Sequence, residues 1–132
     1  MSNRKSIEQE RMQFAFEQSK NAKKAKKYEA YVQKIPAFIM TNGLGNTIAY
    51  ISTQSDDDWK KVGQDICDWL LKVENPFKQK LEVKNGSGDI GIKDLLEVLK
   101  DNRNDSEYKS VTIEVLALFN WLRRFAKTHR KF

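Results

Sequence analysis

Few residues of this sequence have the type and spacing that catalysis requires. Its one histidine, His129, lies near the end of the sequence among cationic residues, and no carboxylate nearby in sequence could orient it as a general base. The serines fall chiefly at expected caps and in loops, without a nucleophile-elbow pattern. We therefore expect no enzymatic activity. The nearest enzymatic alternative is a metal-independent ribonuclease that uses lysines together with His129.

The sequence also offers little to a metal ion or a cofactor. The single cysteine, Cys67, excludes an internal disulfide and a cysteine-clustered metal site, and its place beside the buried stripe of a helix favours a packed small side chain. The triplet from Asp56 to Asp58 has no further carboxylate or histidine at a spacing that would complete a coordination shell. We interpret the triplet as a helix cap, and we expect neither a metal nor a cofactor.

A glycine-containing run, NGSGD from Asn85 to Asp89, could be taken for a phosphate cradle. It lacks the Lys and Ser/Thr of a P-loop and the glycine spacing of a dinucleotide site, and no convincing strand leads into it. We expect a flexible surface loop at about 74–91. The alternative is a small hairpin that pairs the flanking segments LEV, 81–83, and IGI, 90–92.

Charge is the most informative property of the sequence, because the excess of cations is segregated. Residues 20–34 hold six lysines and one glutamate, a net charge of +5, and residues 123–132 hold three arginines and two lysines with no acid, also +5. Residues 56–107 hold nine basic and thirteen acidic side chains, a net charge of −4, within a chain whose net charge is +6. A segregated positive surface suits a polyanion, with an acidic partner protein as the alternative.

The lysines of the first basic segment are expected on a single long helix, from about Asn3 to Ile35, because apolar residues recur there at helical spacing. At about 100° per residue, five of these lysines fall within an arc of roughly 100° on the side away from the apolar stripe. Phe16 and Tyr31 project into the same arc, where they could stack on bases or contact another subunit. Simple hydration of a lysine-rich face is the alternative. The five are Lys20, Lys23, Lys24, Lys27 and Lys34.

The rest of the sequence also predicts helices. The apolar segment from Lys34 to Ile51 contains Pro36, which favours a boundary or kink at Ile35, and the permissive backbone of Asn42, Gly43 and Gly45. Ser55 and Asp58 have the spacing of a capping box before the next helix. Beyond the first helix we expect helices at about 35–41, 44–52, 59–73, 92–100 and 106–128, the last of them central because apolar residues spread over several of its sides.

Length and composition predict one domain. A chain of 132 residues with 39% apolar content can fill one core and is too short for two ordinary ones. We therefore predict an all-α fold, a single compact bundle of about six helices over residues 1–132. No run approaches the roughly 20 apolar residues that cross a bilayer, and the first residues lack the apolar stretch of a secretory signal, so we expect a cytoplasmic protein with no membrane contact.

Four segments of the sequence resemble, in order, those of a known family, the small subunit of the type III-B CRISPR ribonucleoprotein, the RNA-targeting Cmr complex. The paired blocks around TNGLGNTIAY and FNWLRRFA are specific, although Leu118-Phe119 stands where an aromatic followed by leucine is expected, and the middle of the chain, roughly 72–105, carries no such support. The segments are RMQFAFE (11–17), YVQKIPAFIMTNGLGNTIAY (31–50), DICDWL (65–70) and LALFNWLRRFAK (116–127).

The resemblance implies a non-catalytic subunit that stacks in several copies along the duplex of guide RNA and target RNA. It implies as partners the backbone, large and head-capping subunits of that complex and other copies of this chain. Contacts would go to phosphate and 2′-OH, since guide pairing already supplies sequence information. The alternative is a helical adaptor that contacts acidic proteins and no RNA. The predicted RNA-binding residues are Lys20, Lys23, Lys24, Lys27, Lys34, Arg123, Arg124, Lys127 and Arg130, of which the family motif covers Arg123 and Arg124 most firmly and the lysines rest on charge.

Overall fold

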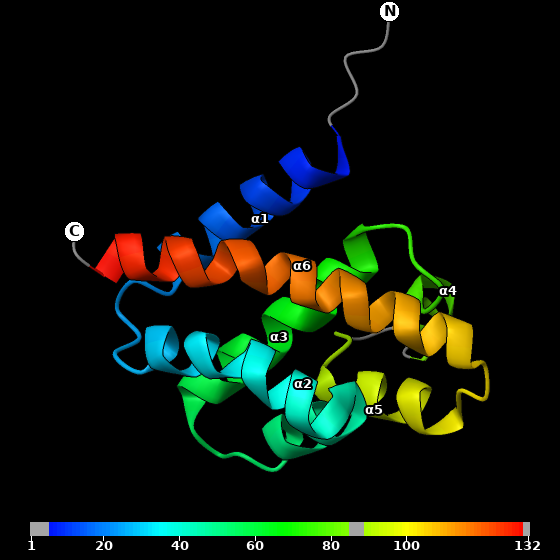
Figure 1. The fold of residues 1–132 in the computed structure, drawn as a ribbon. Helices are drawn as coiled ribbons and strands as arrows, with labels where there is room; N and C mark the ends of the chain where they lie inside the picture. The colour runs from blue at the N-terminus through cyan, green and yellow to red at the C-terminus, as the bar shows by residue number, and fades with distance from the viewer. Residues whose placement is uncertain (1–5, 85–88, 131–132) are drawn as a thin grey trace, which may run out of the picture.

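The computed structural model describes residues 6–84 and 89–130, and it confirms the all-α prediction (Figure 1). The described residues form six helices and no strand. The hairpin alternative is therefore wrong, because residues 81 and 82 end a helix and Ile92 begins another. The helices are α1 (Ile7–Asn21), α2 (Tyr28–Ser52), α3 (Asp57–Lys72), α4 (Lys78–Glu82), α5 (Ile92–Asp101) and α6 (Asp105–Arg130).

Helix α6 packs along both α1 and α2, as its spread of apolar residues predicted. Five of its side chains are fully buried, and they join one continuous core with side chains of every other helix. Burial of a large aliphatic or aromatic side chain contributes about 1.5 to 3 kcal/mol, so this face of α6 stabilises its neighbours as well as itself. The five are Val111, Val115, Leu118, Phe119 and Leu122.

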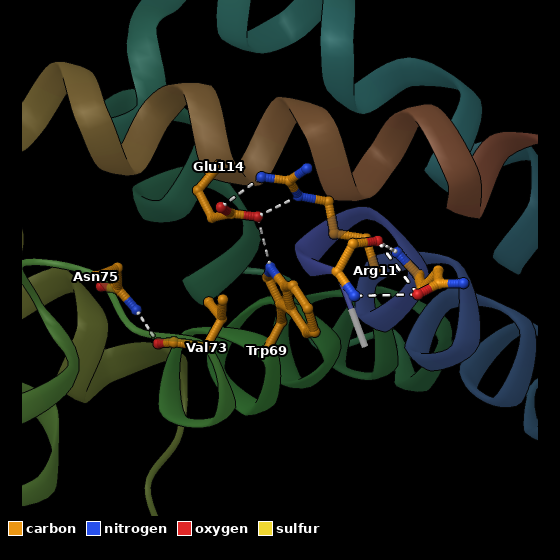
Figure 2. A network of polar contacts seen from close by, with 7 residues as sticks. Arg11, Trp69, Val73, Asn75 and Glu114 are labelled. Atoms are coloured by element: carbon orange, nitrogen blue, oxygen red, sulfur yellow. Dashed lines mark hydrogen bonds and ion pairs between the residues drawn. The ribbon is translucent and has the colours of Figure 1, made fainter. Parts of the chain in front are cut away.

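A polar network ties α1, α3 and α6 together at one point of this core (Figure 2). Arg11 of α1 donates from Nε and Nη2 to the two carboxylate oxygens of Glu114 in α6, at 2.7 and 2.9 Å. Trp69 of α3 donates its indole N–H to the same carboxylate at 3.0 Å. Because the Glu114 side chain is only 13% exposed, all three donors meet a carboxylate that has little access to water.

The predicted long first helix is wrong in one respect: it is two helices, separated by residues 22–27. Lys20 with Lys24, and Lys23 with Lys27, would stand one turn apart on a continuous helix, where like charges destabilise it. The chain instead turns, with backbone hydrogen bonds from Ala25 to Ala22 and from Tyr28 to Ala25. The lysines therefore lie on a connection and the two helix ends beside it.

Helix α2 continues through Pro36, where a boundary was expected at Ile35. The buried side chains of Val32, Ile35 and Ile39 hold both sides of the proline in the core, which offsets the hydrogen bond that proline removes. The predicted break between residues 41 and 44 is confirmed. Gly43 has φ 85° and ψ 161°, a conformation open only to glycine, and it divides α2 into two segments.

Two smaller expectations also change. The cap of α3 is Asp56 rather than Ser55, since the Asp56 carboxylate accepts the backbone N–H of Asp58 at 2.8 Å. The segment expected as a loop at 74–91 contains the short helix α4, because Phe77 and Leu81 are both buried in the core. The NGSGD run falls largely outside the described residues.

Candidate nucleic-acid interface

A buried polar cluster fixes the connection between α1 and α2, and so positions the lysines around it. Asp65 of α3 accepts from the Tyr28 hydroxyl and from the Lys61 ammonium, each at 2.6 Å. Lys61 also donates to Gln18 of α1 at 2.7 Å. The end of α1 and the start of α2 are thus both anchored to α3, on either side of the lysine-rich residues 20–27.

Burial raises the pKa of the Asp65 carboxyl to about 6, while Lys61 and Tyr28 oppose that rise and Asp68 adds to it. Because the folded pKa lies above that of the unfolded chain, folding takes up a proton, and this contribution to stability is full below about pH 4 and lost as pH rises through 6. We expect the stability of the native protein relative to Asp65→Asn to fall by about 2 kcal/mol between pH 4 and 7. Urea unfolding at several pH values measures this, and a difference that stays constant with pH contradicts the prediction.

The structure brings the two basic segments to the same end of the molecule. The C-terminal end of α6 lies beside the connection that follows α1 (Figure 1). Lys23 and Lys26 line one cavity of about 230 Å³ together with Ala126 and His129. Segments about a hundred residues apart in sequence therefore share one surface, which the separate charge sums did not indicate.

A second hollow, of about 220 Å³, lies between α2 and α6. Gln33 of α2 lines it together with Asn120, Arg123, Arg124 and Lys127 of α6. The described part of its lining has three cations and no carboxylate. An anion that entered this α2–α6 hollow would meet positive charge on the α6 side and a neutral amide on the α2 side.

The predicted lysines do not form one ridge. Lys20, Lys23, Lys24, Lys27 and Lys34 are all exposed, but Lys27 forms an ion pair with Asp56 at 3.3 Å and Lys34 lies 5.9 Å from the ring centroid of Tyr31. Within residues 6–84 and 89–130, the other three lysines form no ion pair. Lys27 is therefore the weakest of these candidates, since a surface pair with Asp56 already occupies its ammonium.

The second predicted set, Arg123, Arg124 and Lys127, is exposed on α6 and gathered by the α2–α6 hollow. Arg130 ends α6, and the placement of its side chain lies outside what the structure describes. Phe16 is 43% exposed and contacts Phe125 and His129. Tyr31 is not a free stacking platform, because its ring stacks on Trp59 at 4.1 Å and its hydroxyl donates to Asp56.

Sequence reasoning missed three residues of this surface: Lys26, Gln33 and Asn120. Lys26 is not among the five lysines that share an arc on an unbroken helix, and the break at 22–27 makes that arc no longer apply. Gln33 and Asn120 carry no charge and fit no motif, so only the approach of α2 to α6 reveals them.

The cysteine and the histidine, the side chains best suited to catalysis, are both packed against apolar neighbours. Cys67 is fully buried and burial raises the pKa of its thiol, which fits the predicted packing role. The Nε2 atom of His129 is buried without a hydrogen-bond partner in the described structure, and its ring packs on Phe16.

Across residues 6–84 and 89–130, no group of three or more His, Cys, Asp or Glu side chains could hold a metal ion. None of the described helices has the length and apolar character that crossing a membrane requires.

A family model described as CRISPR-associated protein (Cas_Cmr5) matches residues 7–129 of this chain, nearly its whole length. The chain belongs to the Cmr5 family. It is thus a small subunit of the type III-B CRISPR complex, the Cmr complex, as the resemblance of its motifs indicated. The match extends through the middle of the chain, where the motifs gave no support.

A solved Cmr5 family protein from Thermus thermophilus shares the fold, with a TM-score of 0.73 and 23% sequence identity. The similarity covers 94% of this chain and 97% of that one. The arrangement of helices is therefore that of another Cmr5 protein over nearly the full length of both chains.

Proposed function

We propose that this Cmr5 chain is a non-catalytic subunit that lines up in several copies along the guide and target RNA and holds it by contacts to the sugar-phosphate backbone. It would do so in the cytoplasm, beside the backbone, large and head-capping subunits of the complex. Membership in the Cmr5 family supports the part of this proposal that concerns the complex, and the basic surface supports the part that concerns contact with RNA.

One observation carries the proposal: cationic side chains from both ends of the sequence converge on one end of the molecule. The cavity shared by Lys23, Lys26 and the end of α6 and the α2–α6 hollow both lie there. The cations of the α2–α6 hollow, which has no carboxylate among its described lining residues, destabilise the isolated protein because they repel one another. A polyanion removes that cost, and its binding releases counterions.

The arrangement suits backbone contacts rather than readout of bases. Phosphate contacts fix position without sequence information, and guide pairing provides the sequence in such a complex. The exposed side chains of this surface are mostly lysine and arginine, while Tyr31, an aromatic ring beside them, is engaged with Trp59. We therefore propose that binding is indifferent to target sequence.

The test is charge reversal in the assembled complex. Arg123→Glu with Arg124→Glu should weaken target RNA binding by about tenfold or more, because the variant loses two cations that neutralise phosphate and gains two anions that repel it. Each neutralised phosphate also contributes about −0.7 to −0.9 to the slope of log affinity against log salt concentration. Binding measured from low to high salt should show a shallower slope for the variant. The matched control is Lys100→Glu with Lys109→Glu, at exposed lysines away from this surface, which should leave both affinity and slope near those of the native complex.

A protein adaptor without RNA contact is the second candidate, and a groove between α1 and α6 favours it. Gln9, Met12, Gln13, Phe16, Glu17 and Phe125 line this groove, whose volume is about 570 Å³, and Met12 and Phe16 are exposed there. Exposed apolar side chains of this kind mark protein contacts. If assembled complexes that carry the Arg123 and Arg124 reversals bound target RNA with unchanged affinity and salt slope, while less of the variant subunit entered the complex, the adaptor role would replace the RNA role for that surface.

A further inference from the structure

Gln33 and Arg123 hold one another by a reciprocal pair of hydrogen bonds across the α2–α6 hollow. The Gln33 amide donates from Nε2 to the backbone carbonyl of Arg123 at 2.9 Å. The Arg123 guanidinium donates from Nε to Oε1 of the same Gln33 at 3.2 Å. Each partner therefore fixes the other, although 90 residues separate them in sequence.

This pairing leaves the outer edge of the guanidinium open. Arginine binds phosphate through two parallel N–H donors, which form a fork. In Arg123 the Nε–H group already donates to Gln33, so the two Nη groups are the pair that can form this fork. In the described structure, the side-chain partner of Arg123 is Gln33, whose Oε1 accepts a hydrogen bond from the Nε–H group. The terminal Nη groups keep their donors for a ligand.

The neighbours of Arg123 add charge without competing for its donors. Arg124 and Lys127 line the same hollow, and Asn120 contributes a neutral amide. Among the residues that the structure describes, no carboxylate lines the hollow to neutralise the guanidinium. A long surface arginine ordinarily loses conformational entropy when it binds, and the contact with Gln33 has already restricted Arg123 before a ligand arrives.

We propose that the α2–α6 hollow binds a single RNA phosphodiester, that the Nη groups of Arg123 form its fork, and that Gln33 is the positioning residue that orients the fork. This inference rests on the proposed RNA-holding function and specifies one of its contacts. Arg124 and Lys127 strengthen the binding as point charges. A carboxylate of a partner subunit would fit the same fork, and the experiment below separates that ligand from RNA.

The test uses three single variants in the reconstituted complex with guide and target RNA. Arg123→Lys keeps the charge and removes the fork, so it should weaken RNA binding about three- to tenfold with little change in salt slope. Gln33→Leu keeps Arg123 and removes its orientation, and it should cost a similar factor. Gln33→Glu places a carboxylate against the guanidinium, so it should weaken binding by about tenfold or more, because the new ion pair competes with phosphate.

Thermal unfolding of the isolated subunit shows whether Gln33 only stabilises the fold or also orients Arg123 for RNA. Gln33→Glu should unfold at the same temperature as the native chain or higher, because it adds an ion pair between α2 and α6, while its RNA binding falls. Lys109→Ala is the control, since it removes an exposed cation of α6 that lies away from the hollow, and its RNA affinity should stay within about twofold of native, as expected for a cation that contacts no phosphate.

The outcomes distinguish this inference from the proposed function. If Arg123→Lys and Gln33→Leu bind RNA like the native complex while the double reversal of Arg123 and Arg124 binds weakly, the oriented fork is overturned and the RNA-holding function stands. If the double reversal also binds RNA normally, both are overturned. If the single variants enter the complex less readily, while the complexes that do contain them bind RNA like the native complex, the fork is overturned as an RNA contact and its ligand is a carboxylate of a partner subunit.

Discussion

Replacement of Glu114 with alanine is expected to destabilise the subunit by about 3 to 4 kcal/mol, as is typical when one partner of a buried ion pair is removed. The alanine variant leaves the Arg11 guanidinium without its anion and the Trp69 indole N–H without an acceptor, at a site where Glu114 is 13% and Arg11 21% exposed. It also loosens α1 and α3 from α6 together, because the one carboxylate holds both. Urea unfolding of the isolated subunit measures the change.

Two further variants show whether this network is the cause. Glu114→Gln keeps one oxygen that can accept from Trp69 and from Nε of Arg11, but it loses the charge and the second acceptor oxygen, so its loss of stability should still be smaller than that of the alanine variant. Glu74 forms an ion pair with Lys78, and its side chain is 91% exposed. Glu74→Ala should therefore change the free energy of unfolding by less than about 1 kcal/mol, as is usual for a surface ion pair. Equal losses for Glu114→Ala and Glu74→Ala would contradict the expected role of the network.

The second large effect is expected at Gly43, where alanine should cost about 2 to 3 kcal/mol because its φ of 85° with ψ of 161° is available essentially to glycine alone. A Cβ at this position would meet the Tyr108 hydroxyl at 3.5 Å, an ordinary contact, so the cost comes from backbone strain and not from a clash. The variant should unfold at a lower temperature, as measured by the loss of helical circular dichroism.

Gly45→Ala is the matched control, because Gly45 lies in the same turn near the same hydroxyl but lacks the positive φ. Alanine there should be neutral to within about 1 kcal/mol, since helix propensity favours it over glycine. Tyr108→Phe tests the remaining contact, the 2.8 Å hydrogen bond from the Gly45 N–H to the Tyr108 hydroxyl. If Gly43→Ala and Gly45→Ala cost the same, backbone strain is not the reason that this position needs glycine.

The sequence predicted the helices that periodicity and burial decide together. For α3, α5 and α6, the spacing of apolar residues predicts one helix each, and the observed bounds differ from the predicted ones by a few residues. The break at Gly43 was also predictable, because a glycine between two apolar segments marks a change of direction.

The errors occurred where tertiary contacts outweighed a local rule. Pro36 predicted a boundary, but the buried side chains beside it hold the helix through the proline. Residues 22–27 fit a helical stripe, but like-charged neighbours and the anchoring of Gln18 and Tyr28 on α3 favour a turn. Gln33 could not be predicted at all, since its significance depends on a hydrogen bond to a residue 90 positions away.

The pairing of α1 with α6 has a consequence for biosynthesis. Arg11 of α1 pairs with Glu114 of α6, 103 residues later in the sequence. Helix α1 leaves the ribosome first, and it cannot pack on its main partner until α6 has been synthesised. Helices α2, α3 and α5, which contact one another, can condense earlier around their own apolar residues. A nascent chain halted before α6 would therefore leave α1 without its main packing partner, with Trp69 of α3 as the contact of Phe14, and such a partly packed helix is a target for chaperones until the complete chain buries it.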